Sequence, residues 1–126
     1  MAIGSVAPHE LHACVRNITF RNITFIDPIK AVYVKTNPGS SGDGIIENII
    51  YEDITIEKPK WWGIYIGPRH DTGLGCLLYP FYKTCETQPL VTLRNITLKD
   101  VTMTGGYFPP GVIRCNETNA CHDFKF

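Results

Sequence analysis

The sequence lacks three features that would assign it to common classes of protein. No apolar run approaches the roughly 20 residues that a membrane-spanning helix requires, so we expect no membrane partner. No cluster of lysine and arginine stands out, and 12 basic residues are balanced by 12 acidic ones. This balance argues against a nucleic-acid partner, which would need a basic patch. The first residues, Met1 to Ser5, show no charged region followed by an apolar one, so no signal peptide is visible.

Recognisable metal-binding patterns are missing as well. The five cysteines include no Cys-x-x-Cys pair, and the four histidines do not flank them. The cluster from His9 to His12 does not match the His-Glu-x-x-His zinc motif. We therefore expect neither a metal site nor an organic cofactor.

The cysteines, together with four Asn-x-Ser/Thr sequences, are typical of a protein that follows an oxidising, secretory route. These sequences begin at Asn17, Asn22, Asn95 and Asn116. The odd number of cysteines and the lack of a visible signal peptide are both explained if residues that precede Met1 in the protein are absent from this sequence. The interpretation at this stage is a fragment of a secreted protein.

One segment occurs three times, at residues 15–25, 46–56 and 93–103. Each copy alternates apolar and polar residues and is rich in β-branched side chains, which indicates strands rather than helices. A constant strand pattern with connections of variable length predicts a β-solenoid, in which the copies stack as parallel strands. The side chains expected to point inward are Ile18, Phe20, Ile23, Phe25, Ile49, Tyr51, Ile54, Ile56, Ile96, Leu98, Val101 and Met103.

Asparagine and aspartate occupy fixed positions in these copies. Asn22, Asp53 and Asp100 tolerate the left-handed backbone that a corner between two strands requires. Asn17, Asn48 and Asn95 share another position, and Asn48 is not followed by the glycosylation pattern. A structural stack of asparagines explains all three, so Asn116 is the better glycosylation candidate.

A shorter strand follows each copy, at residues 31–35, 63–67 and 111–115. Tyr33 and Tyr65 share a position in this alignment, which suits either an aromatic ladder or a surface for stacking on a sugar. The same alignment places Arg114 where Val34 and Ile66 point inward, and the sequence offers no explanation for a cation there. Residues 71–92 interrupt the repeat and are expected to form a surface loop, closed by a disulfide between Cys76 and Cys85, within a single unit spanning 1–126.

Residues 2–5 (AIGS), 15–20 (VRNITF), 31–36 (AVYVKT) and 44–54 (GIIENIIYEDI) resemble, in this order, the polygalacturonases of glycoside hydrolase family 28. The resemblance implies an all-β fold, the right-handed single-stranded parallel β-helix of the pectin-lyase-like superfamily. It also implies a monomeric, extracellular enzyme that hydrolyses the α-1,4-galacturonosidic bonds of pectin with inversion. The family's Asn-Thr-Asp, Asp-Asp and Gly-His-Gly motifs precede the first matching residues, so no catalytic residue is expected in this chain and the chain alone should be inactive.

The resemblance also implies roles for individual residues. Lys35 matches the lysine of the family's Arg-Ile-Lys strand, which contacts a galacturonate carboxylate, and Tyr33 replaces the arginine. Arg69 and His70 follow the next equivalent strand, where the family places further substrate-binding residues. Cys115 and Cys121 resemble the family's late disulfide loop, whereas Cys14 has no assigned partner. The alternative is a non-catalytic β-solenoid that binds carbohydrate or serves as a structural surface.

Overall fold

The computed structural model describes residues 1–7, 12–39, 42–69, 74–82 and 85–126. The elements within these ranges are β1 (Ala2–Val6), β2 (His12–Ile26), β3 (Val32–Thr36), β4 (Asp43–Glu57), β5 (Ile64–Pro68), α1 (Leu74–Leu77), β6 (Val91–Thr104), β7 (Gly111–Ile113) and β8 (His122–Lys125). The helix is a single turn, and strands account for nearly all regular structure. The predicted all-β class is therefore confirmed.

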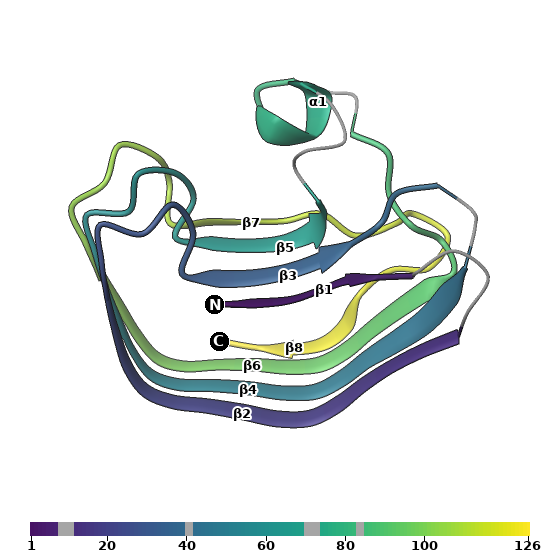
Figure 1. Cartoon of the computed structure of the whole chain (residues 1–126), viewed down its shortest axis with the longest axis horizontal. Coiled ribbons are helices and arrows are strands. Elements are labelled where there is room, and N and C mark those ends of the chain that lie inside the picture. The colour runs from purple at the N-terminus through teal and green to yellow at the C-terminus, as the bar shows by residue number, and fades with distance from the viewer. Residues whose placement is uncertain (8–11, 40–41, 70–73, 83–84) are drawn as a thin grey trace.

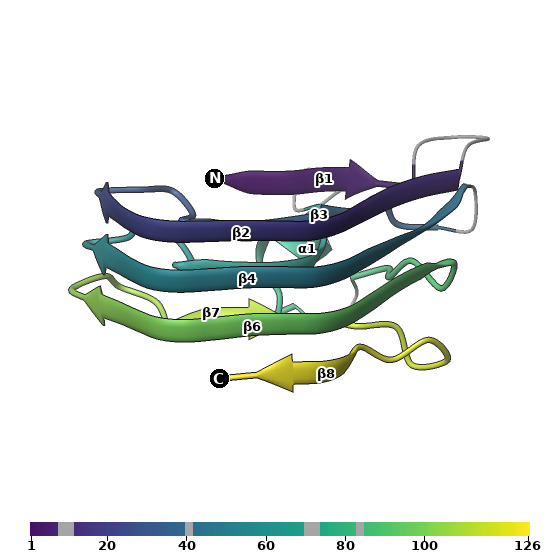
Figure 2. The ribbon, with the colours of Figure 1, turned by 90° about the horizontal axis from the view of Figure 1, so that it is seen from below.

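The strands form two parallel sheets, with the orders β1-β3-β5-β7 and β2-β4-β6-β8. Figure 1 shows these sheets facing one another, and Figure 2 shows the long strands stacked in chain order. Because successive strands alternate between the sheets, each pair of strands is one coil of a parallel β-helix. This is the predicted architecture.

The three repeated segments lie directly over one another. Ile18 is opposite Ile49, which is opposite Ile96 in the next coil. Their side chains fill the space between the sheets together with inward residues of the shorter strands, such as Val34 and Ile66. The interior is apolar because the alternating pattern sends every second side chain of a strand to the same face.

The long strands bend at left-handed residues. Asn22, Asp53 and Asp100 have φ values of 55°, 54° and 52°, as predicted for a corner. The asparagines at the earlier position are also left-handed, with φ of 60°, 56° and 51° for Asn17, Asn48 and Asn95, so each long strand bends twice. The amide of Asn48 donates to the Oδ1 atom of Asn17 at 2.9 Å, and that of Asn95 donates to Asn48 at 2.7 Å. The predicted asparagine stack is thus a hydrogen-bonded ladder.

The register of the third short strand corrects the sequence alignment by one residue. Gly111 pairs with Ile64, not with Gly63, and Ile113 pairs with Ile66. The interpretation of Arg114 as an inward-facing residue was therefore wrong. Ile113 occupies the inward position, and Arg114 follows it at the position of Gly67. The loop insertion also ends at residue 90, because Val91 and Thr92 already pair with β4.

Both predicted disulfides are present, between Cys76 and Cys85 and between Cys115 and Cys121. Cys14 is exposed and forms no disulfide. In the ranges that the structure describes, no helix has the length and apolar character needed to span a bilayer.

Candidate functional site

The sheet β1-β3-β5-β7 has an outer face that carries the residues singled out in the sequence. Val34 and Ile66 belong to the core between the sheets, so their neighbours along each strand point away from it. We call this surface the outer face. It comprises Tyr33, Lys35, Tyr65, Gly67, Val112 and Arg114. Figure 1 shows α1 on this side of the molecule, away from the long strands.

An aromatic ladder forms the base of the outer face. The rings of Tyr33 and Tyr65 meet edge to face, with centroids 5.5 Å apart and planes at 85°. Tyr65 is fully buried and donates a hydrogen bond from its hydroxyl to the carbonyl of Cys76 at 3.3 Å. Burial, followed by the proximity of Tyr33, raises the pKa of Tyr65. Because Tyr33 is only 9% exposed, it offers little ring surface for stacking on a sugar.

Residues from the connections cover this ladder. Trp62 is fully buried and packs against Phe108 and Phe81, with ring centroids 4.7 and 5.7 Å away. Trp61 lies 4.4 Å from Phe108 by the same measure. This cluster could not be predicted from a strand pattern, because its members come from irregular segments of different coils. The feature of the sequence that could have indicated this cluster is the aromatic character of its members.

Lys35 stands at the end of β3 beside the ladder. Its side chain is half-buried, and its Nζ atom lies 5.3 Å from the centroid of the Tyr33 ring. It forms no salt bridge with any residue in the described ranges. Its neighbour in the next coil is Gly67, so no side chain stands between Lys35 and the residue that follows in this column.

Arg114 is that next residue. Its backbone nitrogen donates to the carbonyl of Ile66 at 2.8 Å, which extends the pairing of β7 by one position. A Cβ atom on Gly67 would lie 2.8 Å from the carbonyl oxygen of Arg114 and 3.1 Å from its Cβ. The guanidinium lies 5.3 Å from the centroid of the Tyr79 ring, on the segment between β5 and β6. Among the described residues, Arg114 has no carboxylate partner, and its buried Nε atom has no acceptor.

On the opposite sheet, the arginines and the lysine of the long strands are paired with carboxylates. Glu47 accepts from Arg94 at 2.6 Å and lies 3.4 Å from Arg16. Glu52 lies 2.6 Å from Lys99 and 2.7 Å from Arg21. The hydrogen bond from Lys99, followed by that from Arg21, lowers the pKa of Glu52.

These ion pairs form two ladders across three coils, because the pairing register places Glu47 and Glu52 between cations of the neighbouring strands. The arginines and the lysine of the three long strands are therefore neutralised by built-in carboxylates. On the outer face of the other sheet, Lys35 and Arg114 have no such compensation within the described residues.

A third cation, Lys30, lies at the start of the outer face. Its side chain is buried, with Nζ 5.2 Å from the ring centroid of Tyr33 and 5.5 Å from that of Tyr65. Burial lowers the pKa of Lys30 to about 8. The two phenol rings offset part of the cost of burying the ammonium.

The depressed pKa of Lys30 predicts a specific dependence of stability on pH. The unfolded chain keeps this proton up to about 10.5, whereas the folded chain releases it near 8. The unfolded state therefore binds more protons in that window, and the free energy of unfolding rises with pH. Between pH 7 and 9, we expect the rise to be about 1 kcal/mol larger in the unaltered chain than in Lys30→Met. Urea denaturation at several pH values measures both slopes, and equal slopes would contradict the assignment.

The structure describes some, but not all, of the remaining candidate residues. Arg69 is half-buried after β5, and its backbone nitrogen donates to the carbonyl of Thr36 at 2.9 Å. His70 lies outside the described residues. The Nδ2 atom of Asn116, which a glycan would modify, donates to Thr87 Oγ1 at 2.7 Å. Glycosylation there would leave this nitrogen a single N–H, and it stays a prediction.

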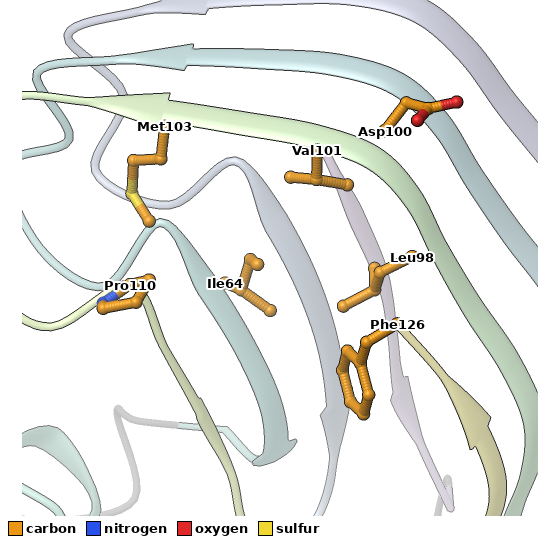
Figure 3. A pocket seen from close by; sticks show the side chains of 7 residues that line it. All are labelled: Ile64, Leu98, Asp100, Val101, Met103, Pro110 and Phe126. Carbon is orange, nitrogen blue, oxygen red and sulfur yellow. The ribbon is translucent and has the colours of Figure 1, made fainter.

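A cavity of about 560 Å³ lies elsewhere, at the end of the coil stack. Figure 3 shows its lining, which includes Ile64, Val101, Met103 and Phe126. The Asp100 carboxylate points away from these apolar side chains in the same view. An apolar lining of this kind suits further packing rather than a polar or anionic ligand.

The outer face carries no catalytic carboxylates of its own. Strands β1, β3, β5 and β7 contain no aspartate or glutamate. In the part of the chain that is described, no three potential metal ligands gather either. The chemistry available here is therefore recognition of an anion by cations beside aromatic rings.

Comparison with known proteins assigns the chain to a family. The model of Glycosyl hydrolases family 28 matches residues 1–126. The chain is 29% identical over 126 residues to proteins described as "Probable endopolygalacturonase D" from Aspergillus flavus and Aspergillus oryzae. The match covers 100% of this chain but only 23% of those relatives. No solved structure matches the chain. Because the family model spans every residue, the chain belongs to glycosyl hydrolases family 28.

Proposed function

We propose that the chain forms a substrate-binding part of a secreted glycoside hydrolase that cleaves galacturonan-type pectic polysaccharide. Membership of a glycosyl hydrolase family supports a hydrolase over a non-catalytic solenoid. The similar Aspergillus proteins are named as endopolygalacturonases, which supports a polygalacturonate substrate. The two disulfides suit an extracellular location.

The observation that carries this proposal is the ammonium of Lys35 on the outer face, which forms no salt bridge with a described residue. A uronate carboxylate would supply the counter-charge that the described residues do not. In this proposal Tyr33 positions Lys35 through the contact between its ring and Nζ. Arg69 and His70 remain proposed as further substrate contacts beyond the end of β5.

The hydrolytic step needs groups that the outer face lacks. Inverting hydrolysis uses one carboxylic acid to protonate the leaving oxygen and one carboxylate to activate water. Since none of the four strands of this sheet carries a carboxylate, we propose that the catalytic pair belongs to other residues of the enzyme. The role of this chain is to bind and orient the polymer.

Calorimetric titration with de-esterified oligogalacturonate tests the proposal. We expect binding that weakens as salt is added, since the contacts are ionic, and much weaker binding of the fully methyl-esterified oligomer. The same samples should release no reducing ends. Equal affinity for both oligomers would overturn the proposed ligand, and measurable hydrolysis would overturn the assignment of catalysis to other residues.

A further inference from the structure

Arg114 is the strongest unassigned feature of the outer face. It belongs to the same column as Lys35, with Gly67 between them. Its charge has no carboxylate partner among the described residues, whereas the long-strand arginines and lysine of the same coils, namely Arg16, Arg21, Arg94 and Lys99, are all paired. A cation that is held in place but not neutralised is suited to an external anion.

The surroundings of Arg114 hold its side chain in position. The guanidinium lies 5.3 Å from the centroid of the Tyr79 ring, close enough for a cation–π contact. Tyr79 belongs to the segment that the Cys76–Cys85 disulfide closes. That segment is attached to the outer face by the hydrogen bond from Tyr65 to Cys76. Arg114 is thus held between the sheet and a cross-linked segment, which reduces the entropy lost on binding.

The spacing of the column bears on what kind of ligand can contact both cations. Neighbouring parallel strands lie about 4.8 Å apart, so the backbones of Lys35 and Arg114 are separated by about 10 Å. A single carboxylate could meet both cations only if the two long side chains converged on it, whereas carboxylates on different residues of one polymer can each meet one cation without such convergence. The glycine between them leaves the column free of an intervening side chain.

We propose that Arg114 binds a second uronate carboxylate of the polysaccharide whose first carboxylate contacts Lys35. This inference rests on the proposed function and extends it from one anionic contact to two. Arg114 is then a specificity-determining residue, which favours a stretch of the polymer with consecutive free carboxylates over a stretch in which one is methyl-esterified.

Titration of variants with de-esterified and fully methyl-esterified oligogalacturonate tests the second contact. Arg114→Gln should weaken binding of the de-esterified oligomer about tenfold, reduce the salt dependence, and leave binding of the esterified oligomer unchanged. Arg114→Lys keeps the charge and should give an intermediate affinity. Lys125→Gln removes an exposed cation from the other sheet and controls for net charge.

The outcomes separate this inference from the proposed function. If Lys35→Gln weakens binding and Arg114→Gln does not, the second contact is wrong and the proposed function stands. An equal loss for both oligomers would show that Arg114 only supports the fold, and would also overturn the inference. If Arg114→Gln does not fold, Arg114→Lys decides, because unchanged affinity and salt dependence would argue against a forked guanidinium contact. If the unaltered chain binds neither oligomer, the proposed function itself fails.

Discussion

Lys35→Ala should reduce the affinity for de-esterified oligogalacturonate by about 10- to 100-fold, the largest loss expected from any single outer-face substitution. A hydrogen bond to a charged group contributes about 1.5–3 kcal/mol, and each 1.4 kcal/mol corresponds to a tenfold change in the dissociation constant. The half-buried ammonium beside Tyr33 is less screened than one in bulk water, so we expect the loss to lie within this range. Calorimetry at fixed salt measures the change.

Two comparisons make the Lys35 result specific. Lys35→Arg keeps a cation at the end of β3 and should retain most of the affinity. Lys125→Ala removes an exposed lysine from the opposite sheet and should leave the affinity unchanged. The free energy of unfolding should change little in all three variants, since Lys35 forms no salt bridge with a described residue. If Lys35→Ala and Lys125→Ala lose affinity equally, the ligand responds only to net charge.

Trp62→Ala should lower the free energy of unfolding by about 3–5 kcal/mol, the range seen when a buried aromatic side chain is truncated. Trp62 is the largest of the fully buried side chains in the described part of the chain. Its ring contacts both Phe108 and Phe81, so its removal leaves a cavity beneath the residues that cover the outer face. Urea denaturation followed by circular dichroism measures the loss.

Trp62→Phe provides the matched control. It should cost much less than Trp62→Ala, because it keeps an aromatic ring and removes an indole N–H that has no hydrogen-bond acceptor among the described residues. Tyr107→Ala, at a side chain that is 94% exposed, should have almost no effect. A cost below about 1 kcal/mol for Trp62→Ala would show that the aromatic cluster does not hold the outer face together.

The long strands were predictable because their signals agree. In residues 15–25, 46–56 and 93–103 the period-two pattern, the β-branched residues and the left-handed asparagines and aspartates all specify the same register, and Ile18, Ile49 and Ile96 stack as expected. The corner at Asn17 and its equivalents was not predicted, because a stack of asparagines alone accounts for their shared position in the sequence. The structure shows that the stack and the left-handed backbone occur together.

The short strands were harder because both of their faces are covered. Val32, Tyr33 and Val34 are all buried, so alternation cannot reveal which side chains point inward. Matching Gly111 to Gly63 then shifted the third strand by one residue and turned Arg114 inward. The cover itself comes from Trp62, Phe108 and neighbours in irregular segments, whose positions follow from packing between coils rather than from any local pattern. Lys35 could be singled out only through its resemblance to a family motif.

Anion binding at the outer face is the central claim, and mapping of backbone amide shifts in a heteronuclear NMR titration tests it most directly. On addition of de-esterified oligogalacturonate, the predicted result is a set of shifts confined to residues 33–36, 65–68 and 112–115, which saturate together and disappear at high salt. Shifts confined to β2, β4 and β6, shifts centred on the apolar cavity near Phe126, or no shifts at all would contradict the account.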